Sequence, residues 1–256
     1  MNFYKITNEE EKHNGLQYKT GLNVDVLPWN PSGNCEPGGI YFSREDILAF
    51  IEYGSWMRRV NIPEGVEIYE NPGEPKKWKA HKVILGERKK IDINIIKGLL
   101  EEGADIHIND ELTLAWASIY GHLEIVKLLI KHGADIHADN DWALRWASEQ
   151  GHLAIVNTLI EHGADVHAHN DWALRWASKN GHLEMIKLLT KRGANVHAAY
   201  SCALRWASEM GHLEVVKLLI KHGAHTRAKN NGALKVARKN GHKKVSEFLL
   251  KHGATK

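Results

Sequence analysis

The sequence predicts a mostly α-helical repeat solenoid preceded by a small α+β domain. Two observations carry this prediction: a step in composition and a fixed period. All six prolines lie within the first 75 residues, whereas 15 of the 17 histidines follow residue 100. Gly-His recurs at 121, 151, 181, 211 and 241, and Gly-Ala recurs at the same 30-residue interval from 103 to 253. We therefore divide the chain into a domain of residues 1–90 and a stack of residues 91–256, made of an N-terminal half-repeat and five repeats.

Each repeat reads as two helices joined by a turn. In one unit, Ala143 to Ser148 forms the first helix, and the apolar residues between Leu153 and Ile160 recur at the three-and-four spacing of a second helix, which Gly163 ends. We expect second helices near 122–132, 152–162, 182–192, 212–222 and 242–252, with a further helix near 92–102 at the start of the stack. So short a pair cannot bury its apolar face alone, so neighbouring units must stack.

The repeat resembles the ankyrin repeat. The resemblance is carried by Gly-His-Leu-Glu-Ile-Val-Lys-Leu-Leu-Ile-Lys-His-Gly-Ala-Asp-Ile at 121–136 and its copies. The first helix departs from the family, because Trp142-Ala143-Leu144-Arg145 stands where Thr-Pro-Leu-His is usual. The unit is also about three residues shorter than the usual 33. We place this deletion in the turn between units and expect the projecting β-finger to be short or absent.

The 30-residue unit is similar to that of ankyrin proteins of giant DNA viruses. Segments of the first domain, such as Gly38-Gly39-Ile40-Tyr41-Phe42, resemble a small domain that precedes the repeats in such proteins. This resemblance implies a viral origin and no particular activity for residues 1–90. In that domain we expect a helix from Arg44 to Tyr53 behind Ser43 as N-cap. We expect strands at Leu22–Leu27, Gly39–Phe42, Met57–Ile62, Val66–Tyr69 and His81–Leu85.

Composition restricts the class of protein. The net charge of +3 comes from 34 basic and 31 acidic residues that are interspersed, which argues against a dedicated nucleic-acid binder. Two cysteines exclude a disulfide framework, and the sequence has neither a signal-like start nor an apolar run of membrane-spanning length. We expect a soluble, monomeric protein in the host cytoplasm, with association with the virion as the alternative.

Two periodic sets of side chains invite a chemical role. His107, His137, His167 and His197 recur once per repeat, but stacked helices lie about 8–10 Å apart while zinc ligands lie about 2 Å from one ion. Arginines at 145, 175 and 205 accompany tryptophans at 116, 146, 176 and 206, a pattern compatible with nucleic-acid stacking. We favour structural roles for both sets: the tryptophans in the inter-repeat core, the arginines packed on a ring or bonded to a carbonyl. We expect no metal and no cofactor.

Catalysis has one candidate set, Cys35 with His13 or His81, and no motif supports it. The run Gly38 to Ser43 followed by a helix resembles ADP-ribosyl-transfer domains, without their complete catalytic set. We therefore expect no catalytic residues and interpret the chain as a scaffold for protein–protein interaction. The alternative is an enzyme in residues 1–90 that the repeat stack targets. An enzyme should gather His13, Cys35 or Glu36 at a deep polar cleft, whereas a scaffold should lack one.

The predicted partner-binding surface consists of positions that vary between repeats once the core is assigned. They lie in the turns between units and in the two residues before each Gly-His. Unconstrained drift at solvent positions would give the same variation, so both explanations stay open. Trp142 and Trp172 favour an interface, because large aromatic side chains are typical anchors. The predicted set is Tyr120, Asp141, Trp142, Glu149, Gln150, Asp171, Trp172, Lys179, Asn180, Tyr200, Glu209 and Met210.

Overall fold

The computed structural model describes residues 2–30 and 38–255, and the chain divides into two compact units. One unit comprises Met1–Trp116 and Lys127–Asp135, and the other comprises Ala117–Val126 and Ile136–Lys256. The predicted boundary near residue 90, between a small α+β domain and the repeat stack, stays a prediction. Each unit is described separately below.

The first unit contains antiparallel sheets. The largest has the strand order β1 (Phe3–Thr7), β6 (Trp56–Asn61), β9 (Lys82–Leu85) and β4 (Gly21–Val24), with β10 (Lys89–Lys90) also pairing with β6. A second sheet has the order β5 (Ile40–Phe42), β8 (Trp78–Ala80) and β7 (Tyr69–Glu70), and β2 (Lys12–His13) pairs with β3 (Leu16–Gln17). A core that includes Phe42, Val60, Trp78 and Val83 joins the two larger sheets.

The sequence located four of these strands and missed others. The predicted strands at β4, β5, β6 and β9 are present, although β4 ends at Val24 instead of Leu27. The predicted strand Val66–Tyr69 is wrong, because only Tyr69 belongs to a strand there. The predicted helix is the 3-10 helix η1 (Glu45–Tyr53), with Arg44 at the N-cap position and no side-chain capping bond, so Ser43 is not its cap. The side chain of Ser43 instead donates to the carbonyl oxygen of Lys76 at 2.7 Å.

The first helix of the stack is α1 (Ile93–Glu101), as predicted. Asp92 caps it by accepting from the backbone amides of Asn94 and Ile95, both at 3.0 Å. After α1, the amide of Asp105 donates to the carbonyl oxygen of Glu45 at 2.8 Å. In the next repeat the equivalent amide, that of Asp135, donates to the carboxylate of Glu111. Through η1, the N-terminal domain thus supplies the acceptor that the first helix of a full repeat supplies elsewhere. This explains how a half-repeat can begin the stack.

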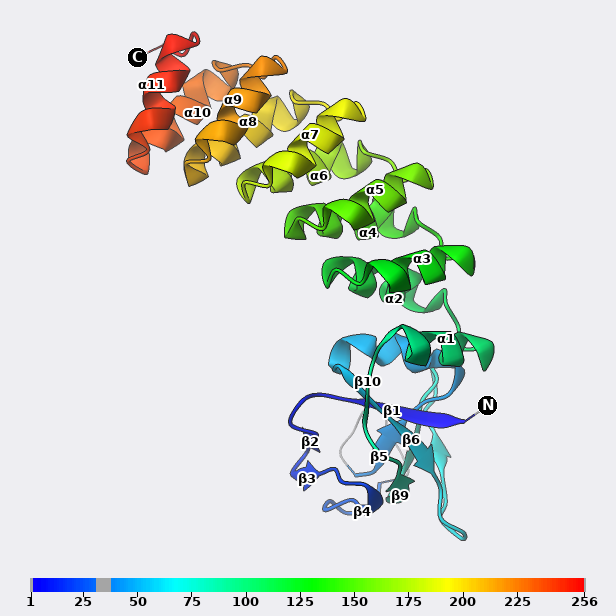
Figure 1. Ribbon diagram of the computed structural model, residues 1–256. Helices are drawn as coiled ribbons and strands as arrows, with labels where there is room; N and C mark the ends of the chain where they lie inside the picture. Colours follow the sequence, from blue (N-terminus) through cyan, green and yellow to red (C-terminus); the bar gives the residue numbers. More distant parts are fainter. Residues whose placement is uncertain (1, 31–37, 256) are drawn as a thin grey trace. The chain divides into compact units, whose positions relative to one another are not determined.

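The remaining helices recur at the predicted 30-residue step. Second helices are α3 (Leu123–Lys131), α5 (Leu153–Glu161), α7 (Leu183–Lys191), α9 (Leu213–Lys221) and α11 (Lys243–Lys251). First helices are α2 (Ile108–Ile119), α4 (Ala138–Gln150), α6 (Ala168–Lys179), α8 (Ala198–Met210) and α10 (Ala228–Lys239). In the second unit α4, α6, α8 and α10 pack in one layer, and α5, α7, α9 and α11 pack in another (Figure 1). Between the layers lie buried residues such as Leu144, Ala147, Val156 and Leu159 and their copies.

A left-handed turn replaces the β-finger between repeats. Within the described part of the stack no strand connects the helices, as expected from the shortened unit. Instead, three consecutive residues at each junction have positive φ, for example Asp139 (φ 46°), Asn140 (φ 55°) and Asp141 (φ 55°). This conformation costs about 1–2 kcal/mol per non-glycine residue, and Asn and Asp tolerate it best. The turn therefore needs compensating bonds.

Candidate functional site

Arginine side chains stabilise these left-handed turns. Arg145 donates through Nε to the carbonyl oxygen of Asn140 at 2.9 Å and through Nη2 to that of Asp139 at 2.6 Å. Arg175 makes the same pair of bonds to Asn170 and His169, at 2.9 and 2.8 Å. The rigid guanidinium fork matches two neighbouring carbonyls, which a lysine ammonium does not. The expected structural role of these two arginines is confirmed.

Buried carboxylates connect neighbouring repeats at two junctions of the second unit. The carboxylate of Asp141 accepts from the amide of Asp165 at 2.9 Å, and its Oδ1 lies 3.1 Å from Nδ1 of His137. Asp171 does the same with Asn195 and His167, at 2.7 and 3.0 Å. Both aspartates are at most 5% exposed. Their oxygens are engaged in bonds within and between repeats, which gives both aspartates a structural role; their contact with a partner stays a prediction.

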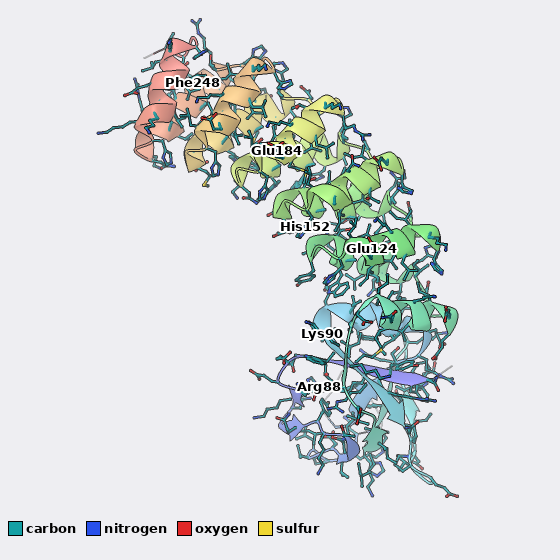
Figure 2. The ribbon with its side chains drawn as sticks, viewed as in Figure 1. Arg88, Lys90, Glu124, His152, Glu184 and Phe248 are labelled. Atoms are coloured by element: carbon teal, nitrogen blue, oxygen red, sulfur yellow. The ribbon has the colours of Figure 1, made fainter. Side chains whose placement is uncertain are left out.

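The Gly-His pair is a contact between neighbouring repeats. His152, in the turn before α5 and labelled in Figure 2, lies with Nε2 2.8 Å from the carbonyl oxygen of Ile119. His182, His212 and His242 make the same contact at 2.8 to 2.9 Å with residues 33 positions earlier. The carbonyl can only accept, so each ring donates through Nε2. These bonds explain the periodic histidines of this pair without any ligand.

Tryptophans and cations contact one another in a row across α4, α6 and α8. Trp172 stacks on Trp176 with ring centroids 5.2 Å apart, and Trp176 meets the edge of Trp206 at 5.3 Å. The Nζ of Lys179 lies 3.9 Å from the ring centroid of Trp176. The guanidinium groups of Arg145 and Arg175 lie 5.5 and 5.6 Å from the ring centroid of Trp172. We call this set the Trp–Arg ladder: Arg145, Trp172, Arg175, Trp176, Lys179 and Trp206.

The tryptophans of the ladder are only half-buried. The expectation that each tryptophan of the first helices fills the inter-repeat core holds for Trp116, which is 7% exposed. It is wrong for Trp146, Trp176 and Trp206, which all remain partly exposed because Leu144, Ala147 and their copies already fill the space between the helices. Indole surface is therefore left open to solvent along α4, α6 and α8.

The other predicted partner-binding residues differ in how much of their surface is exposed. Trp142, Glu149 and Glu209 are half-buried, whereas Tyr200 and Met210 are 74% and 44% exposed. Burial raises the pKa of Glu149, and the charge of Lys179 partly offsets this rise. The remaining exposed members of the set, all in the second unit, are Tyr120, Gln150 and Asn180.

The N-terminal domain contains a cavity that the sequence did not predict. It has a volume of about 250 Å³ and is lined by residues of β1, β2, β5 and η1, among them Lys5, His13 and Tyr18. His13, a candidate of the enzyme alternative, therefore lies at a cavity wall, whereas Cys35 and Glu36 fall outside the described residues. A lysine within the apolar strand sequence Phe3-Tyr4-Lys5-Ile6 was the available signal. It was missed because an isolated lysine in a short strand usually faces solvent.

Within residues 2–30 and 38–255, no group of three or more His, Cys, Asp or Glu side chains is placed to hold a metal ion. In the same part, no helix is long and apolar enough to cross a membrane.

Comparison with known proteins agrees with this architecture. A family model described as ankyrin repeats (3 copies) matches residues 87–170 and 174–256. Putative ankyrin repeat protein R229 of Acanthamoeba polyphaga mimivirus is 36% identical over 135 residues, covering 47% of this chain and 44% of its own length. Uncharacterized protein R869 of the same virus is 36% identical over 132 residues, covering 48% of this chain and 92% of its own length. Putative ankyrin repeat protein R868 is 32% identical over 133 residues, covering 48% of this chain and 63% of its own.

These relatives agree with the resemblance to giant-virus proteins drawn from the sequence. The chain spans less than half the length of R229, so the activity of that whole protein does not transfer to this chain. Ankyrin repeats are generally protein–protein interaction modules and typically not enzymes. The family model covers well over half of the residues, and the chain belongs to the ankyrin repeat family.

Proposed function

We propose that the second unit is a scaffold that binds a protein partner on the face of its first helices, centred on the Trp–Arg ladder. The observation that carries this proposal is the half-buried state of Trp172, Trp176 and Trp206: the first two stack within α6, and Trp176 contacts Trp206 in the next repeat. Partly exposed, mutually supported tryptophans offer large apolar area at low cost in conformational entropy, and tryptophan and arginine are enriched among the residues that dominate binding energy.

Charge on the ladder favours an acidic segment of the partner. Arg145 has Asp139 within 3.6 Å, whereas Arg175 and Lys179 have no salt bridge among the described residues. The exposed Tyr200 extends the aromatic surface, and Lys229 lies 5.5 Å from its ring centroid. A carboxylate-bearing segment that also places an apolar side chain on the indoles would satisfy both properties.

The test compares variants of the intact chain in capture from infected amoeba cells. Trp142→Ala with Trp172→Ala should weaken capture by about thirtyfold or more, since anchor truncations cost about 2 kcal/mol or more. Lys179→Glu should weaken capture through charge. Lys191→Glu makes the same charge change at the exposed end of α7 and serves as the matched control. Unchanged capture by both ladder variants, with an intact fold by circular dichroism, would exclude this face as the binding site.

Two further measurements test nucleic-acid binding and a role in the virion as alternatives. Fluorescently labelled single-stranded RNA and DNA report on nucleic-acid stacking, which the balanced charge of the chain disfavours. Tight, salt-dependent RNA binding without protein capture would contradict the proposal. Capture from the cytoplasmic fraction and from purified virions distinguishes the location that we propose, the cytoplasm of the infected cell, from a role in the particle.

A further inference from the structure

A buried lysine lies at the wall of the cavity in the N-terminal domain. Lys5, on β1, is 9% exposed, and its side chain lines the cavity. Its Nζ donates to the carbonyl oxygen of Tyr41 at 2.9 Å and lies 4.7 Å from the ring centroid of Tyr18. An ammonium group carries three donors, and the carbonyl of Tyr41 is the one acceptor for it among the described residues. A buried cation with unused donors is costly unless something else compensates it.

Acidic groups near Lys5 are committed to other partners. Glu11, which lines the cavity, accepts from Nε and Nη2 of Arg58 at 2.7 and 2.8 Å. Asp25 accepts from the backbone amides of Leu27, at 3.2 Å, and of Gly39. It forms no salt bridge with Lys5 in the described residues, so its charge acts on the ammonium only at a distance. The charge of Lys5 is therefore not neutralised by a direct ion pair.

Aromatic and basic residues line much of the remaining wall, beside aliphatic and neutral polar ones such as Ile6, Ile47 and Asn8. The aromatic residues are Tyr18, Tyr41 of β5, and Phe50 and Tyr53 of η1. Lysines 12 and 77 also line the wall, so among the described residues cationic side chains outnumber carboxylates there. Small-molecule sites are commonly concave, mostly apolar and provided with a few polar groups that fix orientation. The volume of about 250 Å³ suits a molecule somewhat smaller than a typical drug.

We propose that this cavity binds a small organic anion with an aromatic or apolar body, whose anionic group accepts hydrogen bonds from Nζ of Lys5. The anion supplies the acceptors that the ammonium lacks, and the tyrosine and phenylalanine rings contact its body. A metal ion is not the expected ligand, because the Lys5 ammonium would repel it. The two carboxylates nearby, Glu11 and Asp25, are already hydrogen bonded to other groups. The cavity gives the N-terminal domain a role separate from the protein-binding face of the repeats.

Binding should depend on pH through Lys5. Burial lowers the pKa of Lys5 to about 8, partly offset by the charge of Asp25. The pKa of His13 is lowered by burial and by the Lys5 cation, and that of Tyr18 is raised by burial, so both side chains are neutral above pH 7. The cation that attracts the ligand is thus present below about pH 8 and lost above it. The affinity for an anion should fall as the pH rises through this value.

The experiment uses benzenesulfonate, whose charge does not change between pH 6 and 9, and measures its binding to the intact chain by ligand-observed NMR. Benzyl alcohol, a neutral probe of similar size, and inorganic sulfate, an anion without a ring, should each bind at least tenfold more weakly. Benzoate and phenyl phosphate then show whether the anionic group preferred is a carboxylate or a phosphate. Benzyl alcohol binding as well as benzenesulfonate, or no benzenesulfonate binding, would overturn the proposal.

Variants locate the site. Lys5→Met keeps the length of the side chain and removes the charge, and it should weaken benzenesulfonate binding by about tenfold or more, since hydrogen bonds to charged groups contribute about 1.5–3 kcal/mol. Lys82→Met, at an exposed position of β9, is the matched control and should bind as the natural chain does. If Lys5→Met does not fold, the pH profile of the natural chain decides. An affinity that stays constant from pH 6.5 to 9 would exclude Lys5 as the anion-binding group.

Discussion

Replacing Gly181 by alanine tests whether the Gly-His pair works as a contact between repeats. Gly181 has a φ of +77°, and an added Cβ would lie 2.8 Å from Cε1 of His212 in the next repeat. The histidine cannot withdraw freely, because its Nε2 is bonded to the carbonyl oxygen of Lys179 at 2.9 Å. The substitution therefore combines backbone strain with the displacement of a bonded ring.

The magnitude follows from these two costs. The left-handed conformation costs an alanine about 1–2 kcal/mol, and losing the histidine bond costs about 0.5–1.5 kcal/mol. Gly181→Ala should therefore lower the free energy of unfolding by about 1.5–3.5 kcal/mol. Gly241 has nearly the same φ, +76°, but nothing lies within 4 Å of its Cβ position. Gly241→Ala should therefore show only the backbone cost.

The assay is urea unfolding followed by tryptophan fluorescence and circular dichroism. A double-mutant cycle with His212→Ala isolates the contact, because in that background the alanine at 181 has no ring to displace. The double variant should be about 0.5–1.5 kcal/mol more stable than the sum of the single effects. Equal effects of Gly181→Ala and Gly241→Ala, together with additivity in the cycle, would refute the role given to the histidine ring.

Three further predictions concern the junctions, the N-terminal domain and the end of the stack. Asp171→Ala should destabilise the chain by about 2–3 kcal/mol in urea unfolding, since it removes a buried carboxylate that accepts from the amide of Asn195 and contacts His167. Ser201→Asp, which introduces the carboxylate that the equivalent position lacks, should instead stabilise it. The bond from Arg58 lowers the pKa of Glu11 in the folded protein. The ionised Glu11 therefore stabilises the fold fully above the pKa that it has in the unfolded chain, and this stabilisation is lost as the pH falls through the lower pKa of the folded state. In thermal melts, Glu11→Gln should have a lower melting temperature than the natural chain at pH 7, and its melting temperature should depend less on pH between roughly 5 and 3. Deleting residues 229–256 should lower the melting temperature or cause aggregation, because it uncovers the apolar face of the preceding repeat; a stable, monomeric truncation would show that the last repeat is not a cap.

The second helices could be predicted from sequence because their determinants are local. The apolar stripe and the terminating glycine lie within about a dozen residues, and the observed bounds of α3, α5, α7, α9 and α11 differ from the predictions by one residue at each end. Strand β8 had no such signal. All three of its residues, Trp78, Lys79 and Ala80, are buried, so the alternation that identifies a strand is absent.

Site residues were harder to predict because their roles depend on contacts far along the chain. Asp141 looks like a free turn residue until the amide of Asp165, 24 positions later, is seen to donate to it. Lys5 similarly acquires its environment from Tyr18 and Tyr41, on other segments. Variation between repeats therefore identified positions outside the core, but it could not separate those that bind a neighbouring repeat from those that face solvent.

Tyr200 bears on the alternative between drift and function that the sequence left open. It lies at the middle of a left-handed turn, with a φ of 58°, where three of the other four repeats have Asn and one has Asp. Tyrosine tolerates this conformation less well than Asn does. The same junction has Ser201 in the position where other junctions have a carboxylate. Tyr200 itself is 74% exposed. A residue that strains its own turn and buries little surface is not explained by the stability of the fold. Contact of its ring with a partner would explain it, which is why Tyr200 belongs with the Trp–Arg ladder in the proposed interface.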